Sequence, residues 1–463
     1  MPDVTAQEAG SQRGVTQSII GLPMARSRPD NGPDTGVTSQ SVPVGKMARD
    51  IYRRLCRRPK SPFDLSSDFG IVILVPAYHL LRLVFFTLRD NAAVRRQRGI
   101  PLYKQLAAQW RLMTVYGTDP SVYYSSQLYD RPGGVDDIVS YVGRDEIKNG
   151  LLRHLHWMRP KIYGARVSLG DKLAYTRHCE ASGLPAPSVL YLADQGKWSW
   201  LPTGQQPFQM SGDPFDRDIF IKPRKGRGAR GADWFDRIGA GLYRGKNGAV
   251  LRRAELLREI LRRSRRGSIM ILPKLANHPE IADLACNSLI VFRVFTCLDG
   301  DGRPVITHAM LRILSKLEPT WRGSSEYGVL VDLQSGILGQ LCDDDHFAPD
   351  AWLDRHPVTG ARVAGRRIAN WPAIAALALT AHRSFIDRMM IGWDVALTPE
   401  GPMLIEGNAY PDTHFLQRVH RQLIGESPMA PLLHHHLQVL AHKAPRGPFL
   451  LRSHARNDNY LNY

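Results

Sequence analysis

The spacing of apolar and polar residues changes along the chain and predicts a different organisation for each part. Residues 1–45 contain few large apolar side chains among Gly, Pro, Ser, Thr, Gln and Asp, so we expect disorder there. Residues 46–160 are basic and have helical spacing, which predicts a mainly helical N-terminal region. Short apolar strands and a few helices then alternate over 161–440, and we expect an irregular tail over 441–463.

One strongly apolar run, Gly70–Leu88 (GIVILVPAYHLLRLVFFTL), lies inside the helical region between basic flanks. Pro76, His79 and Arg82 interrupt it, and an arginine in the middle of a bilayer is costly. We therefore favour a helix hairpin buried in the core, with a membrane-inserted or interfacial segment as the alternative. The cationic flanks keep peripheral attachment to a membrane open.

The part from residue 167 onward has the pattern of an α+β domain. Asp171 precedes an amphipathic run that Gly183 and Pro185 end, so it can cap a helix. The turn Asp299–Gly302 separates two apolar runs and predicts a hairpin. The other predicted elements are strands within 188–192, 219–221, 268–275, 288–298 and 304–314, a basic-faced helix over 251–266 and a helix over 373–390.

The stretch 391–412 (IGWDVALTPEGPMLIEGNAYPD) predicts a second hairpin, with its turn at 398–401. In such a hairpin Asp394 lies nearly opposite Glu406, and Asn408 shares a face with Glu406 because side chains alternate. Two carboxylates and an amide oxygen are hard donors that suit Mg²⁺. The alternative is a polar, solvent-exposed hairpin.

A formal net charge of +18 on 463 residues indicates an acidic partner, such as a nucleotide, an anionic polysaccharide, a nucleic acid or a membrane surface. The five cysteines are scattered without CxxC spacing, and we infer a reducing, cytoplasmic compartment. The first residues lack the charged and apolar regions of a signal peptide. Charge alone does not choose among these partners, but no nucleic-acid-binding motif is recognisable, so nucleic acid ranks last.

A glycine-rich basic loop follows the strand that ends near Lys222. Gly226, Gly228 and Gly231 allow backbone amides to approach phosphates, and four further cations lie before and among them, namely Arg224, Lys225, Arg227 and Arg230. The spacing is neither that of a P-loop nor that of a Rossmann turn, and a flexible solvated hairpin is the alternative. Lys172 lies in the first turn of a helix, where the helix dipole disfavours a cation. This position suggests that its ammonium binds an anionic ligand, and a lysine that extends along the surface into solvent is the alternative.

Two arginines lie in apolar strands, Arg293 and Arg312. An arginine is always charged, so in such a strand it needs an anionic partner. A structural carboxylate and a bound phosphate or carboxylate are both consistent with this pattern.

Taken in order, these motifs resemble the ATP-grasp superfamily, and most closely its sugar-transfer-associated family. The resemblance covers about 160–440 and rests on a series of motifs whose order is more specific than any one of them. They are DK before a helix that ends GLPAP, a strand-borne KP before the glycine-rich loop, ILPKL then NHPEI, NSLIVFRVFT, HPVTG, and GWDVALTPEGPMLIEGNAYPD.

The resemblance implies a fold of two α+β subdomains that grip ATP, with a lid subdomain over about 211–270. It implies that Lys172 and Lys222 hold ATP phosphates, that Gly226–Gly231 is a mobile loop over them, and that the hinge contacts adenine. The hinge residues are Pro273, Lys274 and Leu275, and the implied magnesium ligands are Asp394, Glu406 and Asn408.

Two features depart from the family pattern. Carboxylate–amine ligases of the superfamily place an arginine two residues before the equivalent of Asp394, where this chain has Gly392. Arg293 or Arg312 would have to replace it in stabilising the acyl oxyanion of the second half-reaction. The segment 326–328 also differs from the Asn and Gly-Gly pattern of the family.

The function that the resemblance implies is that of an ATP- and Mg²⁺-dependent ligase that forms an acyl phosphate and transfers the acyl group to an amine, in polysaccharide or cell-surface sugar metabolism. One alternative is an ATP-grasp kinase that stops after phosphorylating an acceptor. Another is a non-catalytic nucleotide-binding scaffold that its basic region 46–110 recruits to a membrane or to an anionic polymer. If the partner is a membrane, we expect a peripheral position at its inner face. The sequence identifies neither the carboxylate nor the amine.

Overall fold

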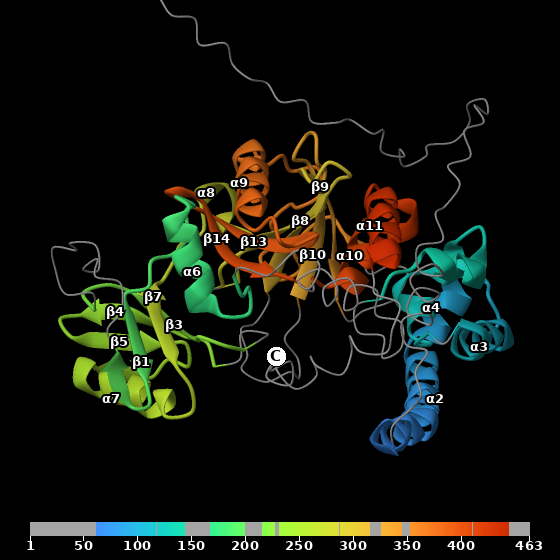
Figure 1. The fold of residues 1–463 in the computed structure, drawn as a ribbon, viewed down its shortest axis with the longest axis horizontal. Helices are drawn as coiled ribbons and strands as arrows, with labels where there is room; N and C mark the ends of the chain where they lie inside the picture. The colour runs from blue at the N-terminus through green and yellow to red at the C-terminus, as the bar shows by residue number, and fades with distance from the viewer. Residues whose placement is uncertain are drawn as a thin grey trace, which may run out of the picture. The chain divides into compact units, whose positions relative to one another are not determined.

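The computed structural model describes residues 62–116, 118–143, 167–199, 215–226, 231–286, 288–314, 326–344, 352–409 and 411–443 (Figure 1). The segment 1–45, for which we expect disorder, lies outside these residues, as does most of the tail 441–463. The described part is α+β, with helices first and then two antiparallel sheets.

The N-terminal helical region begins with one continuous helix, α2 (Pro62–Arg98), so the helix hairpin predicted within Gly70–Leu88 is wrong. Between Ile71 and Arg89 the chain has no Gly, Asn, Asp or Ser to form a turn, and one proline removes only one helical hydrogen bond. Among the described residues, no helix has the length and apolarity needed to cross a membrane. The elements that follow are α3 (Leu102–Arg111), η1 (Leu112–Tyr116), α4 (Val122–Ser125), η2 (Leu128–Asp130) and η3 (Gly134–Ser140).

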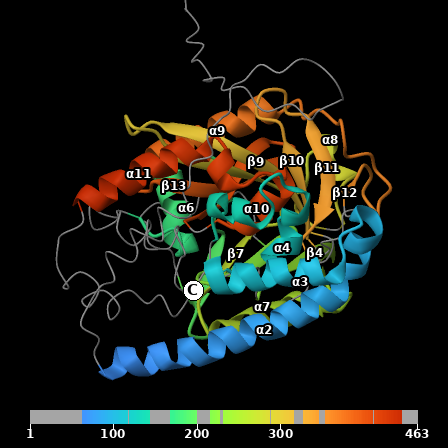
Figure 2. The same cartoon turned by 90° about the vertical axis from the view of Figure 1, so that its right-hand side faces the viewer.

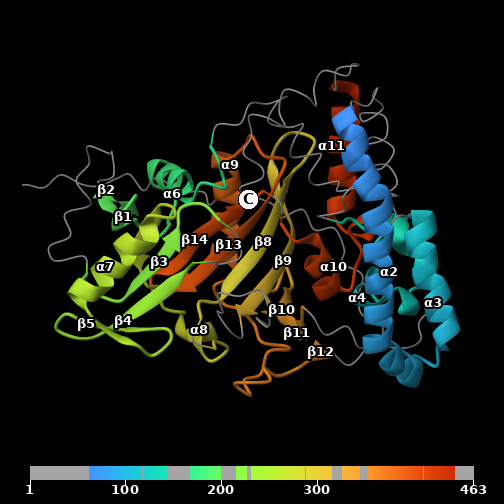
Figure 3. The ribbon, with the colours of Figure 1, turned by 90° about the horizontal axis from the view of Figure 1, so that it is seen from below.

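These helices share a small core and attach to the C-terminal helices. The core includes Phe86, Val94 and Tyr124, and Leu423 from the C-terminal part packs into it. The amide of Val142 donates to the side chain of Gln417 at 3.1 Å. Figures 2 and 3 show α2 and α3 side by side in this region.

The first sheet, sheet A, contains β1 to β7 in the order β2-β1-β7-β3-β4-β5-β6, with neighbours antiparallel. Its apolar residues pack against α7 (Arg253–Ser264), which buries Leu256 and Ile260. Leu173 of α6 (Lys172–Ala181) packs with Leu192 and Met270 in a separate cluster. The strands are β1 (Tyr191–Asp194), β2 (Lys197–Ser199), β3 (Ile219–Pro223), β4 (Asp233–Gly239), β5 (Leu242–Gly245), β6 (Val250–Arg252) and β7 (Ile269–Pro273).

The second sheet, sheet B, has the order β12-β11-β10-β9-β8-β13-β14 and holds the largest apolar cluster of the described residues. Helix α9 (Trp371–Ser384) belongs to that cluster, whereas α10 (Thr413–His420) and α11 (Met429–Lys443) contribute to another. The strands are β8 (Val291–Leu298), β9 (Pro304–Leu314), β10 (Glu326–Val331), β11 (Leu338–Asp343), β12 (Trp352–Leu353), β13 (Met390–Thr398) and β14 (Gly401–Asn408).

One predicted helix boundary in this part is wrong. The helix expected over 373–390 ends at Ser384, because Phe385 leaves the helical conformation and is buried against Tyr175 and Trp393. The chain then turns, with the amide of Arg388 donating to the carbonyl of Phe385, and enters β13 at Met390.

Candidate active site

The hairpin of β13 and β14 places Asp394 opposite Glu406 by means of a β-bulge. From the turn, where Thr398 pairs with Gly401, each step is regular until Val395 pairs with Leu404. One more regular step would set Asp394 opposite Ile405, but the register shifts there and Glu406 takes that place. Directly opposite residues share a face of the sheet, so both carboxylates lie on the same side.

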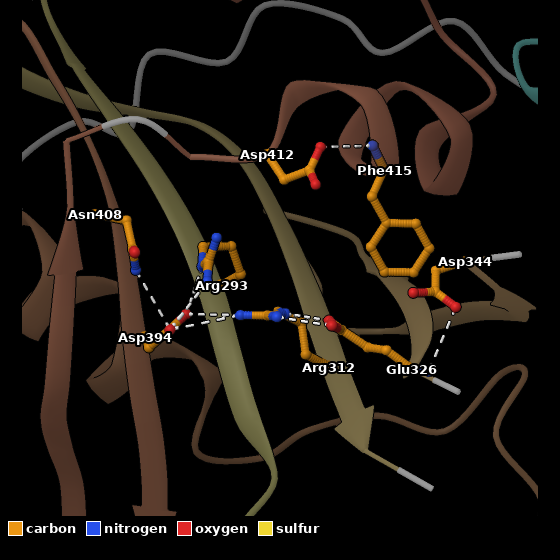
Figure 4. A network of polar contacts seen from close by, with 8 residues as sticks. All are labelled: Arg293, Arg312, Glu326, Asp344, Asp394, Asn408, Asp412 and Phe415. Carbon is orange, nitrogen blue, oxygen red and sulfur yellow. Dashed lines mark hydrogen bonds and ion pairs between the residues drawn. The ribbon is translucent and has the colours of Figure 1, made fainter. Parts of the chain in front are cut away.

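Asp394 is held by the arginine that faces it on the next strand, β8. Arg293 lies opposite Asp394 in register, and its guanidinium donates to both carboxylate oxygens, from Nη2 to Oδ2 at 2.9 Å and from Nε to Oδ1 (Figure 4). The two residues are only 6% and 7% exposed. Burial works to raise the pKa of Asp394, but the positive charges of Arg293 and then Arg312 hold it below its ordinary value.

Arg312, on β9, forms a second bidentate pair with Glu326 on β10. Its Nη2 donates to Glu326 Oε2 at 2.8 Å and its Nε to Oε1, while its Nη1 lies 3.5 Å from both oxygens of Asp394 (Figure 4). Burial opposes the charged form, yet the neighbouring carboxylates of Glu326 and Asp394 raise the pKa of Arg312. The two arginines and two carboxylates therefore form one neutral chain across four strands, which we call the charge ladder.

Both predicted catalytic arginines are thus paired with structural carboxylates. This is the first of the two alternatives that the sequence left open for them. Arg293 uses two of the five N–H donors of a guanidinium on Asp394, so the pairing leaves donors for a ligand.

The two predicted phosphate-binding lysines both lie within electrostatic reach of Glu406. The Nζ of Lys172, in the first turn of α6, lies 3.6 Å from Glu406 Oε1 and donates to the carbonyl of Gly226 at 2.7 Å. On β3, burial lowers the pKa of Lys222 to about 8; the charge of Lys172 acts in the same direction and that of Glu406 against it. Three segments distant in sequence therefore bring two cations and one carboxylate together.

The glycine-rich loop is fastened to α6 at its first residues. Asp171 caps α6 by accepting from the amides of Leu173 and Ala174, and it also accepts from Arg224 Nη2 at 2.6 Å and Nε at 2.9 Å. The amide of Lys172 donates to the carbonyl of Arg224 at 3.1 Å. The start of the loop therefore stays beside the lysine pair.

The glycines of this loop that the structure describes adopt backbone angles that favour glycine. Gly226 has φ +138° and Gly231 has φ +76°. A Cβ on Gly231 would also lie 3.0 Å from Pro223 Cγ, so the return to β4 is tight. Gly228 lies outside the described residues.

The predicted hinge follows the end of β7 at Pro273. The amide of Lys274 donates to the carbonyl of Asp218 at 3.1 Å, and its ammonium pairs with Asp236 on β4 and lies over the ring of Trp234. Leu275 is half-buried, and soon after it the amide of His278 donates to the carbonyl of Leu397 on β13 at 2.9 Å. The segment therefore links sheet A to the hairpin strand.

The predicted metal ligands are close together, but they are not equally available. Asp394 has both oxygens on Arg293, and Asn408 Nδ2 lies 3.4 Å from Asp394 Oδ2. The side chain of Glu406 is 32% exposed, so it is the most accessible carboxylate of the set. The described residues contain no group of three or more His, Cys, Asp or Glu placed to hold a metal, and the predicted set has two carboxylates and an amide. Its donor chemistry fits one divalent cation held mainly by Glu406 and Asn408.

Sequence reasoning did not assign roles to Glu326 and Asp171 in this network. A signal for Glu326 was present, because a buried arginine requires a carboxylate and Glu326 belongs to the segment that departs from the family pattern. Asp171 was predicted as a helix cap, and only the structure shows that the same carboxylate holds Arg224.

Solved structures similar to this chain at low sequence identity include several ligases. They include VanG D-Ala:D-Ser ligase from Enterococcus faecalis (12% identity, 59% of this chain and 62% of that one, TM-score 0.35). D-alanyl-alanine synthetase A from Vibrio cholerae is another (11% identity, 59% of this chain and 65% of that one, TM-score 0.33). A third is L-amino acid ligase from Bacillus licheniformis (11% identity, 58% of this chain and 48% of that one, TM-score 0.32). The chain spans less than two thirds of each of them.

No match was found among curated proteins. The family described as sugar-transfer associated ATP-grasp matches residues 160–426, which is more than half of the chain. The match includes α6 with Lys172, the glycine-rich loop, the charge ladder and the hairpin with Glu406. This chain belongs to the sugar-transfer-associated ATP-grasp family.

Proposed function

We propose that this protein is an ATP-dependent ligase that activates a carboxylate as an acyl phosphate and joins it to an amine. The observation that supports this most directly is the grouping of Lys172, Lys222 and Glu406 beside the base of the glycine-rich loop. Two cations at one half-buried position suit a polyphosphate, and a carboxylate close to them suits a cation bound to that polyphosphate.

In the first step, an oxygen of the substrate carboxylate attacks the γ-phosphorus of ATP and the bond to the β-phosphate oxygen breaks, which releases ADP. Negative charge spreads over the phosphoryl oxygens in this step. The ammonium groups of Lys172 and Lys222 would neutralise that charge from fixed positions, since both lie on regular elements of the fold. Glu406 and Asn408 would hold Mg²⁺, which supplies further positive charge when it is bound.

In the second step, the amine nitrogen attacks the acyl carbon, phosphate leaves, and the nitrogen loses a proton. The family has an arginine two residues before the equivalent of Asp394, and this chain has Gly392 at that position. The neighbours of Gly392 fill the space that a side chain there would need. A Cβ at Gly392 would lie 2.6 Å from Pro411 Cβ and 3.2 Å from Arg293 Cδ, so the stem of Arg293 passes beside this glycine. We propose that Arg293 supplies the guanidinium there, and that Asp394 orients it.

The second candidate is an ATP-grasp kinase that transfers the phosphoryl group to an acceptor and goes no further. It is favoured by the charge ladder, in which both nearby arginines already have carboxylate partners. The family description supports a carbohydrate-linked substrate for either activity, and the scattered cysteines support a reducing, cytoplasmic compartment.

The test is the thermal midpoint of the protein with and without Mg·ATP, because a ligand that binds only the folded state stabilises it. We expect an increase for the parent chain and no increase for Lys222→Met or Glu406→Ala. The matched control is Glu400→Gln, which changes an exposed glutamate in the turn of the same hairpin and should keep the full increase. A folded parent that shows no shift, or variants that shift like the parent, would refute the site.

The two candidates differ in their products. A ligase releases ADP and phosphate together only when both a carboxylate and an amine are supplied. A kinase releases ADP without phosphate and leaves a stable phosphorylated acceptor. Measurement of ADP and phosphate in the same reaction, over a panel of amino acids and amino sugars, therefore distinguishes them.

A further inference from the structure

Helix α2 presents a continuous apolar face to solvent. Leu81, Phe85 and Leu88 are 71%, 58% and 75% exposed, and their spacing of three and four residues puts them on one side of the helix. Tyr78, Leu80 and Val84 are also about half exposed and extend the same surface. Single exposed apolar residues are ordinary, but a contiguous helical face of large ones marks an interaction site.

The opposite side of α2 fixes the helix to the domain. Leu83, Phe86 and Val94 are buried, and Phe86 and Val94 belong to the N-terminal core. Arg82, the charge that interrupts the apolar run, is directed to this side, where its Nη2 donates to Ser121 Oγ at 3.0 Å and its Nε lies 2.6 Å from Asp119. Its Nη1 also donates to the hydroxyl of Tyr78 at 3.2 Å, so this guanidinium lies at the edge of the exposed apolar face and is held there by Ser121 and Asp119.

The neighbouring helix α3 has an inverted distribution of polar and apolar residues. Its buried residues are Gln105 and Gln109, and Gln109 Nε2 donates to Thr87 Oγ1 at 2.9 Å. Its exposed residues include Tyr103 and Trp110, at 68% and 56%. A helix that buries glutamines and exposes aromatic rings presents apolar surface to solvent beside the outward face of α2.

The charge around these helices indicates the chemistry of that partner. The last turn of α2 contains the exposed residues Arg95 and Arg96, and also Arg98, whose Nε pairs with Asp130 at 2.6 Å. The sequence that precedes α2, residues 46–60, has seven lysines and arginines and a single aspartate. Apolar side chains flanked by arginine, with tyrosine and tryptophan among them, match the acyl boundary and the anionic headgroups of a bilayer.

We propose that the outward face of α2, with the exposed aromatic residues of α3, is a docking surface for an anionic membrane. The helix lies in the headgroup region and does not cross the bilayer, which agrees with the absence of a spanning helix among the described residues. This inference does not depend on the reaction proposed above. It places the ATP-grasp domain at a membrane surface, where an acceptor attached to a lipid is accessible.

The experiment is flotation of the full-length protein with vesicles of phosphatidylcholine alone or with about 30% phosphatidylglycerol. We expect binding to the anionic vesicles, weaker binding to neutral ones, and partial loss when salt rises from about 0.1 M to 0.5 M. The variant Leu81→Ser/Phe85→Ser/Leu88→Ser should lower the partition coefficient at least about tenfold. These side chains are exposed, so the thermal midpoint should match that of the parent.

The matched control is Val250→Ser/Val358→Ser, which removes two exposed apolar side chains elsewhere and should bind like the parent. A parent that does not float with anionic vesicles overturns the proposal. So does a triple variant that binds as well as the parent, because the basic residues would then suffice. If the parent is a dimer by light scattering and the triple variant a monomer, the face is instead an interface between two copies.

Discussion

Replacing Arg312 by methionine tests whether the charge ladder stabilises the fold as a set of pairs. Methionine keeps most of the apolar stem but leaves Glu326 without its two hydrogen bonds from the guanidinium. It also removes a positive charge 3.5 Å from Asp394, which Arg293 still neutralises. The double variant Arg312→Met/Glu326→Gln removes both charges of the outer pair and leaves the inner one intact.

The expected loss in unfolding free energy follows from the burial and the bidentate geometry of the Arg312–Glu326 pair. The side chains of Arg312 and Glu326 are 21% and 15% exposed, and the pair is bidentate. Removing one partner of a fully buried pair costs about 3–5 kcal/mol, and the remaining exposure brings the expected loss in unfolding free energy to about 2–4 kcal/mol. The double variant should lie within about 1 kcal/mol of the parent, since it leaves no buried charge unpaired.

The measurement is urea-induced unfolding at neutral pH for the parent, both single variants and the double variant, which together form a double-mutant cycle. We expect Arg312→Met to be the least stable of the four. If the double variant is no more stable than Arg312→Met, the loss comes from packing of the arginine stem and the pairwise account is refuted.

Two further predictions concern the candidate site. Burial lowers the pKa of Lys222 from 10.5 to about 8, so the unfolded chain binds more protons between these values and stability should rise with pH across that window. Urea unfolding of Lys222→Met should lack this rise. Calorimetry on the parent chain should show that affinity for Mg·ATP falls about tenfold between pH 7 and 9 as the ammonium is lost. Gly392→Ala should lower the unfolding free energy measured in urea by about 1–3 kcal/mol, because its Cβ would lie 2.6 Å from Pro411 Cβ. The control Gly239→Ala, whose Cβ would lie 3.9 Å from its nearest neighbour, should lower it by less than about 1 kcal/mol. Equal losses would contradict the steric argument.

Much of the fold could be predicted because local signals and tertiary structure agree. The turns at Asp299–Gly302 and 398–401 do close hairpins, and Asp171 does cap a helix. Apolar alternation identified β8 and β9 because one turn joins them and their pairing is local. The family could be predicted for a similar reason, since its motifs depend on order along the chain.

Other features could not be predicted because they depend on contacts between distant segments. The bulge at Ile405 adds one residue to the ladder, and counting from the turn does not reveal it. The interruptions at Pro76, His79 and Arg82 favoured a core hairpin, whereas the chain forms one continuous helix, α2. Periodicity could not show which face of that helix is exposed, because its apolar residues lie on all sides of it. The partners of Arg293 and Arg312 come from other strands, and sequence could specify only that each needed an anion.

The strand order of sheet B has a consequence for the chain as it leaves the ribosome. Strands β8 to β12 follow one another in sequence and in the sheet, but β13, the other neighbour of β8, begins only at Met390. The ribosome adds about 5–20 residues per second, so the apolar strand β8 forms an edge of the sheet for several seconds before β13 is synthesised. Its one charged residue, Arg293, then lies unpaired in the middle of that edge. A charge in this position discourages another nascent chain from adding a strand there, until Asp394 arrives and makes the arginine part of the core.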